Sequence, residues 1–152
     1  MRIKQYLLPV LWGLLTSGLI ISSGCSSEVV DTPVNEDIEV PSSVIEDVTA
    51  QEAYALIEEN LDNPDFIIID IRTPEEYDEG HLEGARNIDF YEPDFAEQID
   101  ILDKDNSYLV YCRSGTRSGN SLPVFEEKGF LKIYHMDGGI LEWTAEELPL
   151  VK

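Results

Sequence analysis

Apolar and polar residues alternate in blocks from about residue 44 onward, and the apolar blocks predict the strands of a sheet. Residues 66–71 form an almost continuous apolar run, which is typical of a parallel-sheet strand buried on both faces. Residues 108–111 form a similar run, which predicts the central strand. Shorter apolar segments predict three further strands, at residues 44–48, 86–88 and 131–135.

Helical segments separate these strands. Thr49 and Glu52 form a capping box, and Thr73 followed by Pro74 is a second helix start. Three more helices are predicted over residues 95–102, 118–128 and 140–147. The second contains Pro123, which should kink the helix or mark a tight first turn. Strands that alternate with helices predict a three-layer α/β domain over residues 44–150, with a central parallel β-sheet flanked by helices.

The first 43 residues have a different pattern. Arg2 and Lys4 precede an apolar run over residues 7–21, and small residues lead from Ser22 to Cys25. This pattern predicts a signal peptide over residues 1–24, followed by a flexible, acidic, Ser- and Pro-containing tether over residues 25–43.

The segment resembles a lipoprotein signal, which implies that Cys25 is lipidated. One position departs from that pattern, because Ser22 stands where a leucine is preferred. Ordinary cleavage and an uncleaved anchor are the alternatives. We therefore expect an exported protein, anchored in a membrane and facing the periplasm or the cell exterior.

The composition is strongly acidic, with a formal net charge of −21. Loss of residues 1–24 would remove two basic and no acidic residues, which changes the charge to −23. Such a charge argues against nucleic acid as a partner and against electrostatic docking on anionic lipid. Arg113 and Arg117 are two of the few remaining cations, and both are close in sequence to Cys112.

Cys112 follows the predicted central strand and precedes a helix. A strand that turns through small residues into a helix directs backbone N–H groups and the helix dipole at one spot, which favours a thiolate or a bound anion. Nearby cations also lower a thiol pKa. We therefore predict a catalytic Cys112 and an active-site loop formed by Arg113, Ser114, Gly115, Thr116, Arg117 and Ser118.

Two other interpretations of Cys112 remain. It is either a small buried cysteine in a turn that carries arginines, or the partner of Cys25 in a disulfide. The disulfide would join a flexible terminus to the base of a structured loop.

Four motifs carry a resemblance to a known family. They are Asp70-Ile71-Arg72 with Glu76-Tyr77, the segment 80–85 with Asn87-Ile88, the Cys112 loop, and Gly138-Gly139-Ile140 with Trp143. Together they resemble a single-domain rhodanese, a sulfurtransferase, over residues 44–146.

The resemblance implies a two-step transfer through a persulfide on Cys112. The donor would be thiosulfate or a polysulfide, and the acceptor a thiol or cyanide. Arg113 and Arg117 would attract the anionic donor, and Arg117 would also brace the loop. The resemblance implies no cofactor and no metal.

Two alternative functions follow from the same fold. Phosphatases and arsenate reductases of related fold use a Cys-x5-Arg loop, whereas Cys112 and Arg117 are in a Cys-x4-Arg arrangement, which suits a sulfur atom better. A non-catalytic sulfur carrier or protein-binding module is the alternative from another functional class.

The remaining polar residues receive supporting roles. Asp70 and Arg72 end a buried strand, and we expect them to form an ion pair or a hydrogen bond to a loop and to support the active-site region. His81 is expected to bind the backbone of its own turn, whereas His135 has no obvious partner. The acidic pair Glu75-Glu76 is interpreted as a solvated helix face.

Overall fold

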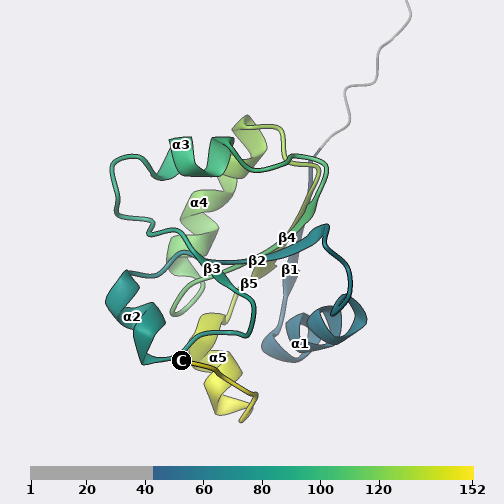
Figure 1. Cartoon of the computed structure of the whole chain (residues 1–152), viewed down its shortest axis with the longest axis vertical. Helices are drawn as coiled ribbons and strands as arrows, with labels where there is room; N and C mark the ends of the chain where they lie inside the picture. The colour runs from purple at the N-terminus through teal and green to yellow at the C-terminus, as the bar shows by residue number, and fades with distance from the viewer. Residues whose placement is uncertain (1–42) are drawn as a thin grey trace, which may run out of the picture. The chain divides into compact units, whose positions relative to one another are not determined.

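The computed structural model describes residues 43–152, which form a five-stranded sheet flanked by helices (Figure 1). The strands, all parallel, have the spatial order β1-β5-β4-β2-β3. Their bounds are β1 Val44–Val48, β2 Phe66–Asp70, β3 Arg86–Asn87, β4 Ser107–Tyr111 and β5 Lys132–Met136. The predicted α/β class with a central parallel sheet is therefore confirmed.

Helices cover both faces of this sheet. Their bounds are α1 Ala50–Glu59, α2 Pro74–Glu79, α3 Phe95–Asp100, α4 Thr116–Glu127 and α5 Gly139–Ala145. The predicted capping box at Thr49 is present before α1, and the predicted helix start at Thr73 is also a capping box, formed with Glu76 before α2. The helix predicted from residue 118 begins two residues earlier, at Thr116, and contains Pro123 as expected.

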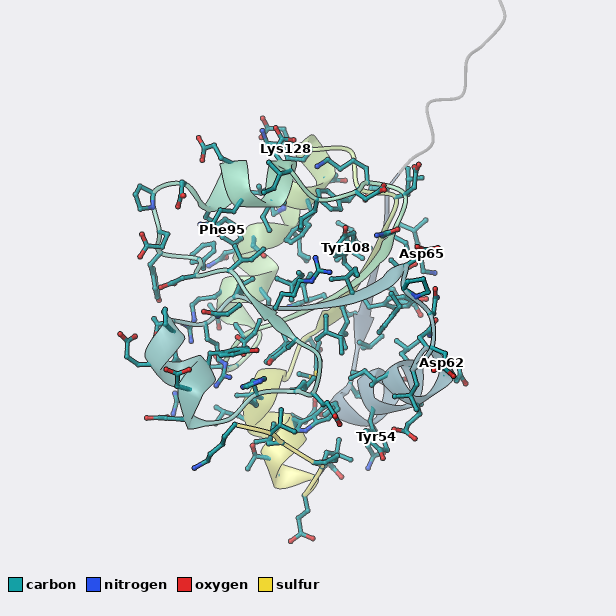
Figure 2. All side chains as sticks on the ribbon, in the orientation of Figure 1. Tyr54, Asp62, Asp65, Phe95, Tyr108 and Lys128 are labelled. Atoms are coloured by element: carbon teal, nitrogen blue, oxygen red, sulfur yellow. The ribbon has the colours of Figure 1, made fainter. Side chains whose placement is uncertain are left out.

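Two hydrophobic cores, one on each face of the sheet, hold these layers together. Leu109 of β4 packs with α1 and α5, and its neighbour Val110 packs with α3 and α4. This alternation follows from the strand pleat, which points successive side chains to opposite faces. Figure 2 shows Tyr108 inside the body of the domain and Asp62 at its edge, and Tyr108 is only 1% exposed.

The predictions for the N-terminal segment are not tested. The signal peptide over residues 1–24, the lipidation site Cys25 and the tether, apart from Ser43, lie outside the described residues. Within residues 43–152, no helix combines the length and the apolar character that crossing a bilayer requires.

Candidate active site

Cys112 directly follows β4 at the carboxyl edge of the sheet. Its side chain is a free thiol that is 1% exposed, and three residues separate it from the first residue of α4. Ligand sites in parallel α/β sheets lie at this edge. The predicted order of strand, cysteine loop and helix is confirmed.

The loop favours the ionised form of Cys112. Burial opposes ionisation of the thiol, but the Ser118 hydroxyl and the backbone N–H groups of Ser118, Ser114 and Arg117 outweigh it. The pKa of Cys112 is therefore below the usual value for a thiol. The Ser118 hydroxyl lies 3.4 Å from Cys112 Sγ and is itself fully buried. Hydrogen bonds to the charged form of a group lower the pKa of an acid in this way.

A glycine-dependent contact holds the loop in place. Gly115 has a φ of 79°, and a Cβ atom there would collide with the carbonyl oxygen of Asp137. The start of α5 also binds the loop, because the N–H groups of Ile140 and Leu141 donate to the carbonyls of Cys112 and Arg113, at 2.9 and 3.0 Å. The turn after β5 thus fixes the backbone that surrounds the thiol.

Arg117 braces the loop from α4. Its two terminal nitrogens bind the two carboxylate oxygens of Glu76, at 2.7 and 2.8 Å. A bidentate pair of this kind fixes the orientation of the guanidinium. The interpretation of Glu76 as a solvated side chain without a partner was wrong, because α2 carries this carboxylate to the start of α4.

The Glu76–Arg117 pair predicts a pH dependence of stability. The hydrogen bond from Arg117 holds the pKa of Glu76 below its ordinary value of 4.5. A depressed carboxyl pKa contributes stability above about pH 4.5, and this contribution is lost as the pH falls through the folded-state value. Urea unfolding between neutral and acid pH should therefore show a shallower acid loss for Glu76→Gln than for wild type. Exposed Glu75→Gln is the matched control, and equal acid slopes for the two variants would contradict the prediction.

Arg113 differs from Arg117, because it is exposed and belongs to no salt bridge among residues 43–152. It lines an open pocket of about 520 Å³ beside the loop. Arg72 and Leu141 form other parts of the wall, whereas the buried Cys112 does not line this pocket. Arg113 is thus the loop cation that is available to an incoming anion. Ser114 and Thr116 are exposed beside it.

Asp70 and Arg72 form a buried ion pair at the end of β2, which is one of the two expected arrangements. Asp70 is fully buried and Arg72 is 5% exposed, and their shortest contact is 2.6 Å. Arg72 also donates to the carbonyl of Gly80 at 2.7 Å. The pair therefore links the end of β2 to the turn that follows α2.

The two histidines differ in their environment. His81 contacts the carbonyl of Tyr77 at 3.1 Å, which agrees with the expected backbone role. The expectation that His135 lacks a partner was wrong. The residue is 6% exposed, and its ring lies 2.7 Å from Asp47 and 3.0 Å from Ser118. A polar residue near the carboxyl end of a buried strand was the available signal, but the sequence does not show that this strand lies beside β4.

Metal ligation has no evident place in the described part of the chain. Within residues 43–152, no three His, Cys, Asp or Glu side chains are grouped so that they could hold a metal ion.

The fold and the site together define the class of protein. It is a parallel α/β domain with a cysteine loop at the carboxyl end of its central strand. The family model of the rhodanese-like domain matches residues 38–146. The chain belongs to this family.

Curated relatives add one finding. The tRNA uridine(34) hydroxylase of Cronobacter sakazakii is 31% identical over 123 residues, which cover 78% of this chain and 35% of the relative. The enzyme of the same name from Escherichia coli is 32% identical over 127 residues, with 78% and 35% covered. The chain thus spans about a third of the length of these relatives.

Solved structures agree with the fold. A rhodanese-related protein from Thermoplasma volcanium is similar with a TM-score of 0.55 and 27% identity, covering 72% of this chain and 97% of that one. A Rhodopseudomonas palustris protein of unknown function, described as a possible tyrosine phosphatase, has a TM-score of 0.61 and 26% identity. That match covers 70% of this chain and 85% of the other.

Proposed function

We propose that the chain is a sulfurtransferase that moves sulfane sulfur from thiosulfate or a polysulfide to a thiol or cyanide acceptor. The observation that carries this proposal is the buried Cys112 thiol, whose pKa the loop N–H groups and Ser118 lower. Such a thiol is ionised more readily at neutral pH, and the thiolate is the reactive nucleophile.

The first step forms a persulfide. The Cys112 thiolate attacks the outer sulfur of thiosulfate, the sulfur–sulfur bond of the donor breaks, and sulfite leaves with the bonding electrons. The exposed cation Arg113 attracts the anionic donor toward the loop that carries Cys112, and the loop N–H groups hold the new terminal sulfur as they held the thiolate.

The second step releases the sulfur. A cyanide ion attacks the outer sulfur of the persulfide, thiocyanate forms, and the bonding electrons return to Cys112 as a thiolate. A thiol acceptor attacks in the same way and becomes a persulfide itself. Each half-reaction balances without a cofactor, and the two together give ping-pong kinetics.

A phosphatase or arsenate reductase is the weaker proposal for this site. The loop has the shorter Cys-x4-Arg spacing, and Arg117 is already bound by both oxygens of Glu76. An oxyanion that needed this guanidinium would have to displace the carboxylate.

The hydroxylase activity named for the curated relatives is not proposed for this chain. This chain spans about a third of the length of those relatives, and its formal charge of −21 opposes contact with a tRNA backbone. The proposal includes export and membrane anchoring through Cys25, which rest on the signal-like pattern of residues 1–24.

Intact mass tests the proposed function directly. After incubation with thiosulfate or polysulfide, the full chain is expected to gain the mass of one sulfur atom and to lose it on addition of cyanide. Cys112→Ser is the matched control and should gain none. A folded wild-type protein with a free thiol that gains no sulfur from either donor would overturn the proposal in favour of a binding module.

A further inference from the structure

A row of hydrogen-bonding side chains leads away from Cys112 to the protein surface. Ser118 Oγ lies 3.4 Å from Cys112 Sγ and 3.0 Å from His135 Nε2, and His135 Nδ1 lies 2.7 Å from an Asp47 carboxylate oxygen. Three different elements supply this row. Asp47 of β1 is in register with His135 of β5, and β5 pairs with β4, which ends beside Cys112.

The Ser118 hydroxyl has one proton and three neighbouring acceptors. These are Cys112 Sγ, the Gly115 carbonyl oxygen at 3.0 Å, and His135 Nε2 whenever that nitrogen lacks a proton. The direction of the hydroxyl proton therefore depends on which ring nitrogens of His135 are protonated.

Each ring nitrogen of His135 faces an acceptor oxygen. His135 Nδ1 faces a carboxylate, and His135 Nε2 faces the Gly115 carbonyl at 3.2 Å as well as Ser118 Oγ. A doubly protonated ring donates at both ends, which leaves the Ser118 proton free to bind the sulfur. A ring without a proton on Nε2 would instead compete with the sulfur for the Ser118 proton.

We propose that His135, held by Asp47, is a positioning residue that directs the Ser118 hydroxyl proton to the sulfur of Cys112. Asp47 from β1, and Cys112 through Ser118, are the titratable groups that face the ring. Gly119 of α4 packs against the ring without a side chain.

Burial makes this arrangement effective. His135 is 6% exposed and Ser118 is fully buried, so water does not compete for the contact between them. Asp47, by contrast, is 69% exposed. Ser118 and His135 thus interact away from water, whereas Asp47 can be substituted without disturbing the core.

Two variants of His135 distinguish its contact with Ser118 from its contact with Asp47. An asparagine amide can replace Nδ1 toward Asp47 but does not reach Ser118, whereas the longer glutamine amide can donate from about the position of Nε2. The test is the rate of alkylation by iodoacetamide as a function of pH. It uses the full chain with Cys25→Ala, so that Cys112 is the only thiol.

His135→Asn is expected to slow alkylation at neutral pH by roughly threefold to tenfold, the range that follows from losing one ordinary hydrogen bond. The midpoint of its pH profile should move upward. His135→Gln and Asp47→Asn should move the profile in the same direction by less. A thermal midpoint measured on each variant monitors folding. If His135→Asn does not fold, Asp47→Asn at the exposed end carries the test.

Ser118→Ala decides whether His135 acts through the hydroxyl. In that background His135→Asn should have little further effect on the profile, because coupled residues are not additive. If folded His135→Asn and Asp47→Asn show the same pH profile of alkylation as wild type, the proposal is overturned. It is also overturned if His135→Asn has its full effect on that profile in the Ser118→Ala background.

The inference rests on the proposed function only in taking Cys112 as the reacting group. Alkylation requires no sulfur donor, so its result does not depend on persulfide formation. If the alkylation profile shifts in the His135 variants as expected but wild type forms no persulfide, the sulfurtransferase proposal is overturned and the role of His135 is supported. If wild type forms the persulfide but the alkylation profiles do not shift, the role of His135 is overturned and the sulfurtransferase proposal is supported.

Discussion

A Gly115→Ala chain is expected to unfold well below the wild-type temperature and to lose the reactivity of Cys112. The residue has a φ of 79°, a left-handed conformation that costs a non-glycine residue about 1 to 2 kcal/mol. An added Cβ would also collide with the Asp137 carbonyl oxygen, which is backbone and cannot rotate away. We expect a total loss above about 3 kcal/mol, because strain and overpacking combine.

Gly129→Ala is the matched control for this experiment. Its φ of 81° imposes the same conformational cost, but a Cβ atom there meets nothing within 4 Å. Urea unfolding of both variants therefore distinguishes the cost of the left-handed backbone conformation from the cost of the collision with Asp137. Equal losses of unfolding free energy at the two positions would show that the turn at Asp137 yields easily and does not hold the cysteine loop.

Local sequence signals account for most of what could be predicted of the fold. The apolar runs of β2 and β4 and the capping residues Thr49 and Thr73 each act within a few residues of the chain. The cysteine loop is equally local, since the N–H groups that act on Cys112 come from Ser114, Arg117 and Ser118, all within six residues of it. Even here the helix start was placed two residues late, because Gly115 bends the chain so sharply that α4 begins at Thr116.

The contacts that the sequence did not reveal join distant segments. Glu76 and Arg117 are 41 residues apart, and Asp47 and His135 are 88 residues apart. The strand order β1-β5-β4-β2-β3 brings both pairs together, because it places β1 beside β5 and β2 beside β4. Hydrophobic periodicity shows which face of a strand is buried, but not which strand is its neighbour.

Breaking the buried Asp70–Arg72 ion pair is the second change expected to have a large effect on stability. Asp70→Asn is expected to lower the unfolding free energy by about 3 to 5 kcal/mol, because the Arg72 charge would stay buried without its counter-ion. Asp70 is fully buried, Arg72 is 5% exposed, and their contacts include Nε at 2.9 Å and Nη2 at 2.6 Å from one carboxylate oxygen. Urea unfolding of the full chain measures the loss.

A double variant tests whether this cost is that of an unpaired charge. Asp70→Asn together with Arg72→Met removes both charges and keeps an apolar stem in place of the guanidinium. Replacing a whole buried pair is far less costly than breaking it, so the double variant should recover much of the stability lost by Asp70→Asn alone. A double variant no more stable than Asp70→Asn would show instead that the contact of Arg72 with the Gly80 carbonyl holds the end of β2 against the turn after α2.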